Sequence, residues 1–258
     1  MDRPYRHILV SRDADVGIVT MNRPERRNAL SEAHMVELIE ALRVLGERED
    51  VRAVVLAAAG PVFCAGHDFA DMVERGLDGM RELFAVCAEL MQTIHRVPQP
   101  VVARVQGIAT AAGCQLVATC DLAVAAEGAT FATPGGKGNW FCTTPMVAVS
   151  RAIGHKRALE LLFTGDPIDA PTALAWGLVN RVVPAEALAE ESARLARAAS
   201  RGSRTSKAIG KRAYYDTIDL DLETAYVDAS EIMAKSSMRD EAREAMSRFL
   251  EKRRSEKQ

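Results

Sequence analysis

Short apolar runs alternate with amphipathic segments along most of the chain. The runs are rich in β-branched residues, as buried strands are, and they lie at 16–21, 51–60, 97–107 and 122–126. Ser31 is placed to cap a helix over the amphipathic segment that follows it, and another helix is predicted over 78–95. Strands and helices that alternate in this way predict an α/β core with a mostly parallel sheet.

The pattern becomes mainly helical towards the C-terminus. We expect an ordered loop at 133–145, because it contains three Gly and two Pro, and then a short helix capped by Asp169. One more strand at 178–183 precedes three helices, of which the last two are strongly amphipathic. The predicted organisation is a core over 1–200 and a helical region over 201–258, whose apolar faces pack either on the core or on another subunit.

The composition is that of an ordinary globular protein. A chain of 258 residues with 48% hydrophobic content can bury a substantial core. The 33 Lys and Arg against 35 Asp and Glu give a net charge of -2, which excludes the basic footprint of a nucleic-acid binder. No run approaches the ~18 apolar residues that a membrane-spanning helix needs. A small or neutral partner is therefore expected.

The cysteines and the N-terminal residues indicate the cellular compartment of the protein. The five cysteines are odd in number and show neither C-x-x-C spacing nor nearby His pairs, so neither a disulfide framework nor a metal site is predicted. The first residues carry scattered charges instead of the apolar stretch of a signal peptide. These features predict reduced thiols in a cytoplasmic protein.

Two loops carry the candidate chemistry, FCAGHDF at 63–69 and GIATAAGCQL at 107–116. Each offers backbone N–H groups with little side-chain cover, and the second also begins a short helix. Two such groups aimed at one point form an oxyanion hole; alternatively, the small residues only allow a helix to pack close to a strand. Gln115 either ties its helix to a neighbouring loop or belongs to the site, because a buried amide needs hydrogen-bond partners.

Four segments, in matching order and spacing, resemble the enoyl-CoA hydratase/isomerase (crotonase) superfamily. They read RPERRNAL at 23–30, FCAGHDF at 63–69, GIATAAGCQLVATCDLAVAAEGATFATP at 107–134 and FTGDPIDAPTALAWGLVNRVVP at 163–184. Within the superfamily, TAAGCQL is similar to the enoyl-CoA hydratase domain-containing proteins. The resemblance implies a crotonase (ClpP-like) spiral of ββα units and a C-terminal helical region that builds homotrimers, usually paired into hexamers.

The resemblance also implies a coenzyme A thioester as ligand, with no permanently bound cofactor and no metal. Carried over residue by residue, the thioester oxygen is held by the backbone N–H groups of His67 and Ala112, and the CoA moiety by the loop with Arg27 and Ala29. The remaining ligand contacts expected in and beside the matching segments are Ala65, Gly66, Phe69, Ile108, Ala111, Pro134, Gly135 and Trp140.

The sequence departs from the family at two positions. Family hydratases place one Glu in the helix after the oxyanion turn and a second Glu after the Pro of the next strand, whereas this chain has Gln115 and Gly135 there. A glutamine orients water or a thioester but has no pKa suited to proton transfer, and general acid–base catalysis commonly contributes about 10²–10⁴-fold. Hydration by a pair of glutamates is therefore not expected.

Several residues have two possible roles. His67 and Asp68 are the titratable groups nearest the oxyanion loop, but His67 can act through its backbone alone and Asp68 can be a turn-forming cap. Trp140 is expected to wall the acyl pocket and Cys142 to be a buried thiol. Arg27 either contacts CoA phosphate or belongs to a solvated basic loop.

Three functions follow as alternatives. The first is an acyl-CoA enzyme of hydratase/isomerase type, a lyase or isomerase of fatty acid metabolism, that stabilises a thioester enolate or oxyanion. The second is a non-catalytic acyl-CoA-binding protein that kept the pocket. The third is a family reaction that needs no paired Glu, such as decarboxylation of a malonyl-type thioester, with His67 or Asp68 as its polar group.

Overall fold

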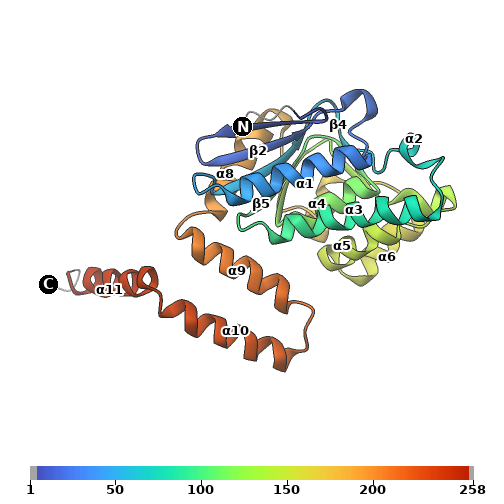
Figure 1. The fold of residues 1–258 in the computed structure, drawn as a ribbon. Helices are drawn as coiled ribbons and strands as arrows, with labels where there is room; N and C mark the ends of the chain where they lie inside the picture. The colour runs from blue at the N-terminus through green and yellow to red at the C-terminus, as the bar shows by residue number, and fades with distance from the viewer. Residues whose placement is uncertain (1–4, 256–258) are drawn as a thin grey trace. The chain divides into compact units, whose positions relative to one another are not determined.

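The computed structural model describes residues 5–255, without the side chains of residues 254 and 255. The chain forms two compact units, Met1–Ser200 and Arg201–Gln258, which are described separately (Figure 1).

The larger sheet of the first unit has six strands in the order β1-β2-β3-β5-β7-β10. These are β1 Ile8–Asp13, β2 Val16–Met21, β3 Ala53–Ala58, β5 Val101–Val105, β7 Leu122–Ala126 and β10 Arg181–Val183. Only β1 runs antiparallel to its neighbour, and the rest of the sheet is parallel. The predicted parallel α/β core is confirmed, and β1 is a strand that the sequence analysis missed.

A second sheet has four short strands, ordered β4-β6-β8-β9. They are β4 Val62–Cys64, β6 Ile108–Thr110, β8 Thr130–Ala132 and β9 Ile168–Asp169. Successive turns of the chain place β3, β5 and β7 in the larger sheet and β4, β6 and β8 in the smaller one, so the chain winds as a spiral of ββα units. The sequence analysis took 63–69 as a loop, but its first two residues belong to β4, because a strand of three residues is too short to show a period of two.

Helices cover both faces of the larger sheet. On one face, α1 Glu32–Glu47 runs beside α3 Leu77–Arg96 (Figure 1), and Ser31 caps α1 by accepting a hydrogen bond from the His34 N–H, as predicted. On the other face, α8 Leu188–Ala199 packs against small and β-branched residues of the sheet. The remaining helices of this unit are α2 Phe69–Met72, α4 Ala112–Thr119, α5 Thr143–Ile153, α6 His155–Thr164 and α7 Ala170–Trp176.

Three single-turn 3-10 helices complete this unit: η1 Pro24–Arg26, η2 Pro134–Gly138 and η3 Ala185–Ala187. The predicted ordered loop at 133–145 thus contains η2 and the start of α5. Asp169 caps α7 by accepting a hydrogen bond from the Thr172 N–H, as predicted. All five cysteines are buried free thiols.

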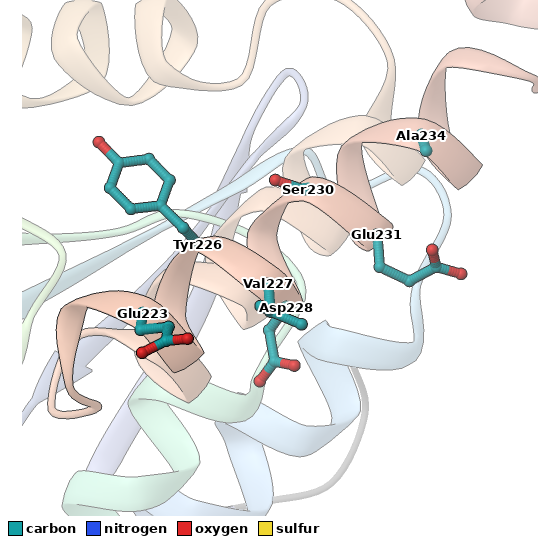
Figure 2. A pocket seen from close by; sticks show the side chains of 7 residues that line it. All are labelled: Glu223, Tyr226, Val227, Asp228, Ser230, Glu231 and Ala234. Carbon is teal, nitrogen blue, oxygen red and sulfur yellow. The ribbon is translucent and has the colours of Figure 1, made fainter.

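The second unit consists of α9 Arg204–Thr217, α10 Leu222–Ser237 and α11 Asp240–Ser255. Four helices therefore follow β10, where the sequence analysis predicted three, because the Ser203 side chain accepts from the Ser206 N–H and begins a separate helix at α9. A shallow pocket lies along α10, and all of its lining residues come from that helix (Figure 2). No helix within the described residues is long and apolar enough to cross a membrane.

Candidate active site

The two glycine-containing loops meet at one edge of the smaller sheet. They follow β4 and β6, which are adjacent parallel strands with Cys64 opposite Ala109. At Gly66, which has a φ of +93°, an added Cβ would lie 2.9 Å from the Ala111 Cβ and 3.5 Å from the Ala112 backbone nitrogen. Only glycine therefore allows the first loop to approach the beginning of α4 this closely.

A single bridge to the loop before α1 sets the direction of the His67 peptide group. Leu30 pairs with His67 in parallel, since its N–H donates to the Gly66 carbonyl at 2.8 Å and its carbonyl accepts from the Asp68 N–H at 3.0 Å. In a parallel pair that bonds the two flanking residues, the polar groups of the residue between them point away from the partner strand. The N–H of His67 therefore faces away from Leu30, and no partner for it is found in the described part of the chain.

The second loop reaches the start of α4 through a strained residue. Ala111 has φ 52° and ψ −118°, a conformation that costs a residue with a Cβ of order 1–3 kcal/mol. Its N–H is held by the Ala132 carbonyl at 2.9 Å, and its carbonyl accepts the first helical bond, from the Gln115 N–H. The N–H of Ala112, the first residue of α4, has no partner among the residues described, and it lies at the positive end of the helix dipole.

The His67 side chain is half-buried. It contacts the edge of Phe84, with ring centroids 5.2 Å apart, and its Nε2 is buried without a hydrogen-bond partner among the described residues. Burial lowers the pKa of His67 to about 4, against a smaller raising effect of Asp71. The imidazole is therefore neutral at pH 7.

Asp68 is held by two interactions. One carboxylate oxygen accepts from the Ala70 N–H at 3.2 Å and caps α2, and the other accepts from an Arg23 guanidinium nitrogen at 3.0 Å. The Arg23 side chain is 13% exposed and that of Asp68 is 11% exposed. This is the turn-forming role that the sequence analysis offered as the alternative to catalysis, with an ion pair that it did not predict.

The segment that links η2 to α5 folds back on Gly135, the second residue of η2. The Gly135 carbonyl accepts from the Trp140 N–H at 2.9 Å, and the Gly135 N–H donates to the Cys142 sulfur at 3.3 Å. An added Cβ at Gly135 would lie 2.1 Å from the Trp140 carbonyl oxygen and 2.8 Å from the Cys142 sulfur. Burial raises the pKa of Cys142, so its sulfur stays protonated at neutral pH.

Sequence comparison agrees with this ββα spiral. The enoyl-CoA hydratase/isomerase family model matches residues 11–257. The chain belongs to this family, which is the crotonase superfamily. Enoyl-CoA hydratase domain-containing protein 3 of rat is 44% identical over 237 residues, covering 92% of this chain and 79% of the relative. Its human counterpart is 42% identical over 236 residues, covering 91% and 78%.

Solved structures of the enoyl-CoA hydratase/isomerase family share the fold. The crystal structure of an enoyl-CoA hydratase from Mycobacterium smegmatis has a TM-score of 0.92 and 48% identity, covering 96% of this chain and 97% of its own. Human enoyl-CoA hydratase domain-containing protein 3 also has a TM-score of 0.92, at 40% identity, covering 96% and 98%.

These relatives correct the predicted cytoplasmic location. The rat and human relatives carry the word mitochondrial in their names, as do those of mouse, Xenopus laevis and Danio rerio. The prediction rested on reduced cysteines and on the N-terminal residues, and free thiols persist in any reducing compartment. The cytoplasmic assignment is therefore wrong by this comparison and is withdrawn.

At the first position where the family resemblance places a glutamate, Gln115 is buried on α4 and 5% exposed. The only hydrogen bond recorded for its side chain in the described residues is a weak one, from the Cys87 sulfur to Oε1 at 4.0 Å. The amide nitrogen makes none among those residues, so the tie to a neighbouring loop that the sequence analysis considered is not observed. Nothing in the sequence around Cys87 indicates this contact with a residue 28 positions away.

The loop with Arg27 and Ala29 is tightly built. Arg27 and Asn28 both have positive φ, near 52° and 53°, and the buried Asn28 amide donates to the carbonyls of Ala59 and Val62, each at 2.8 Å. Arg27 is exposed and its carbonyl accepts from the Ala65 N–H at 3.1 Å. The sequence analysis missed the role of Asn28 in holding this loop, which only its position within the family-like segment RRNAL could have indicated.

An apolar wall extends from the His67 ring towards solvent. Phe84 of α3 contacts Trp140 at 5.9 Å between ring centroids, and Trp140 contacts Phe69 at 6.5 Å. Phe69 is 71% exposed and Trp140 is 45% exposed. The predicted residues Phe69 and Trp140 are thus brought together. Phe84 also belongs to this wall, but the sequence analysis missed it, because nothing in the pattern of its helix distinguishes it from the other apolar residues.

The other predicted ligand contacts lie on the same framework. Ile108 is exposed on β6, and Pro134 begins η2. Within the described residues there is no group of three or more His, Cys, Asp or Glu side chains that would hold a metal ion.

Proposed function

We propose that the protein binds an acyl-CoA and polarises its thioester carbonyl with the backbone N–H groups of His67 and Ala112. The observation that carries this proposal is the junction at Gly66, where two N–H groups without a partner among residues 5–255 lie on loops in direct contact. A thioester oxygen that gains negative charge is stabilised by such fixed donors, each commonly worth ~3–4 kcal/mol in the transition state.

The CoA part of the ligand is proposed to contact the loop with Arg27 and Ala29. The exposed Arg27 offers a charged donor for phosphate, and its carbonyl is bonded to the Ala65 N–H, two residues before His67. The acyl part is proposed to run along the wall formed by Phe84, Trp140 and Phe69, because an apolar chain covers these rings from water.

The reaction proposed is enolate or oxyanion chemistry on the thioester without a pair of carboxylates. Gln115 is available to orient a thioester or a water through its amide nitrogen, but it transfers no proton at neutral pH. The His67 ring is neutral and the Asp68 carboxylate is paired with Arg23, and neither residue stands at the two positions, Gln115 and Gly135, that match the family glutamates. Hydration by the two-glutamate mechanism is therefore not part of the proposal.

A second candidate is a non-catalytic acyl-CoA-binding protein. The observation that favours it is the turn at Gly135, where the Trp140 carbonyl occupies the space that any side chain would need. A protein with this turn can still bind the ligand, but it has no side chain at the position of the second family glutamate.

One set of measurements separates these candidates. Calorimetric titration with short- and long-chain acyl-CoAs measures binding, and assays with 2-enoyl-, 3-enoyl- and malonyl-type thioesters measure hydration, double-bond shift and decarboxylation. Binding with turnover of any of these supports the enzyme, binding without turnover supports the second candidate, and failure to bind any CoA ester excludes both. Loss of decarboxylation in His67→Ala or Asp68→Ala would show that the reaction depends on the altered side chain.

We also propose that the second unit joins copies of the chain into a homotrimer or a hexamer. Its helices expose large apolar residues, among them Leu222, Tyr226, Met233, Phe249 and Leu250. Apolar surface of this extent is typical of subunit contacts. Light scattering coupled to gel filtration tests this, and a monomer at micromolar concentration would contradict it.

A further inference from the structure

Arg23 joins the proposed CoA loop to the oxyanion loop. One guanidinium nitrogen donates to the Ala29 carbonyl at 2.8 Å and to the Ser31 hydroxyl at 3.2 Å, and the other donates to Asp68 at 3.0 Å. The Arg23 backbone N–H is itself held by the Asn28 side chain at 2.9 Å. A single, mostly buried side chain therefore connects two loops that are 45 positions apart in the sequence.

The ion pair between Arg23 and Asp68 restrains the residue next to His67, whose N–H is proposed to hold the thioester oxygen. The two residues that flank His67 are bonded to Leu30 through their backbones, and Asp68 is additionally held by Arg23 through its side chain. Loss of the ion pair would loosen the bond between the Asp68 N–H and the Leu30 carbonyl, and with it the Leu30–His67 bridge that sets the direction of the His67 N–H. Because oxyanion donors act only when their geometry is fixed in advance, this restraint bears on catalysis.

The geometry points to Arg23 and Asp68 as a positioning pair that aims the His67 N–H at the thioester oxygen, a role that rests on the proposed function. Neither side chain needs to touch the ligand. The pair also gives a route by which a ligand seated on the loop at Ala29 steadies the oxyanion donor, because Arg23 holds the Ala29 carbonyl and Asp68 together.

The infrared stretch of a bound thioester carbonyl reports this role without turnover. The probe is hexanoyl-CoA labelled with carbon-13 at the thioester carbonyl, which has no double bond to hydrate or shift. In the wild-type protein, two aligned donors lower the carbonyl stretching frequency on binding. Asp68→Asn keeps an oxygen that can cap α2 but removes the negative charge. Arg23→Gln removes the guanidinium nitrogens that bond Ala29, Ser31 and Asp68.

We expect each variant to lose at least half of the frequency shift, while its affinity for free CoA stays within about threefold of wild type. If the protein turns over an acyl-CoA, kcat falls about 10- to 100-fold with little change in KM. The double variant is no worse than Arg23→Gln alone, because Arg23→Gln already removes the contact with Asp68. Arg181→Gln, which breaks a half-buried ion pair with Glu191 on the larger sheet, is the matched control and keeps the full shift.

Thermal unfolding of each variant shows whether it is folded. Arg23→Lys replaces Arg23→Gln if that variant does not fold, because a single ammonium group does not reproduce the guanidinium that bonds Asp68 and the Ala29 carbonyl together. A full carbonyl shift in folded Asp68→Asn and in the folded Arg23 variant overturns the positioning role alone. A wild-type protein that binds the labelled thioester without any shift, or does not bind it, overturns the proposed function as well.

Discussion

An added Cβ at Gly135 would lie 2.1 Å from the carbonyl oxygen of Trp140. Real Cβ atoms do not approach a backbone oxygen this closely, so the turn from Gly135 to Cys142 has been shaped around the missing side chain. In this chain the second family glutamate is therefore absent, and the backbone around Gly135 also leaves no room for a side chain at that position.

Substitution at Gly135 should destabilise the protein. We expect Gly135→Ala to lower the free energy of unfolding by about 1–3 kcal/mol, because the turn must open to admit a methyl group. Gly138→Ala is the matched control, since an added Cβ there meets nothing within 4 Å. Urea unfolding measures the free energy of both variants.

The same turn predicts that restoring the two glutamates does not restore hydration. We expect the double variant Gln115→Glu with Gly135→Glu to gain no hydratase activity on crotonyl-CoA, because the Trp140 carbonyl occupies the space that a side chain at 135 would need. A gain of hydratase activity would contradict this account.

Gln115 should matter little for stability, because the one hydrogen bond of its side chain to the described residues is the weak one from Cys87. We expect Gln115→Met to change the free energy of unfolding by less than about 1 kcal/mol while it alters acyl-CoA binding or turnover. Gln99→Met is the contrast, since the Gln99 amide donates to the carbonyls of Leu45, Gly46 and Val51, and its loss should cost about 2–3 kcal/mol. Equal losses in the two variants would assign Gln115 a structural role.

The strained backbone at Ala111 predicts a stabilising substitution. Glycine adopts φ 52° and ψ −118° without a Cβ penalty, so Ala111→Gly should raise the free energy of unfolding by about 1 kcal/mol after the greater freedom of the unfolded chain is counted. Ala118→Gly, within α4, should lower it by about 1 kcal/mol. Thermal and urea unfolding compare the two, and a loss of stability in Ala111→Gly would show that the Ala111 methyl contributes more through packing than it costs in strain.

Two histidines, the buried His34 and the half-buried His67, predict how stability depends on pH. Burial lowers the pKa of both His34 and His67 from 6.5 to about 4. Between these values the unfolded chain binds more protons than the folded one, so stability is full above about 6.5 and falls as the pH is lowered towards 4. The expected loss is on the order of 2–3 kcal/mol for each residue.

Urea unfolding between pH 4.5 and 7.5 measures this dependence. His67→Phe should remove about half of the slope of stability against pH. His155→Gln is the control at an exposed position on α6 and should leave the slope unchanged. A slope that His67→Phe does not reduce would mean that the ring titrates in the folded protein much as it does in the unfolded chain.

Local sequence patterns predicted the elements that have strong local signals. The apolar run at 16–21 forms β2 with the same bounds, and the caps at Ser31 and Asp169 begin their helices as expected. Capping and β-branched runs depend on neighbours within a few positions, so they can be read from the chain directly. The very short strands β4, β6, β8 and β9 have no such signal, because each gains its stability by pairing with a strand from another turn of the spiral.

By itself, the sequence determined the α/β class, the family motifs and the two positions, Gln115 and Gly135, where carboxylates are absent. These depend on residue identity and short-range pattern. Only the tertiary structure decided that the Asp68 carboxylate pairs with Arg23, that the His67 ring packs against Phe84, and that the Trp140 carbonyl fills the space beside Gly135. Each of these depends on which distant segments the two sheets bring together, and burial and hydrogen bonding at those junctions set the chemistry of the side chains.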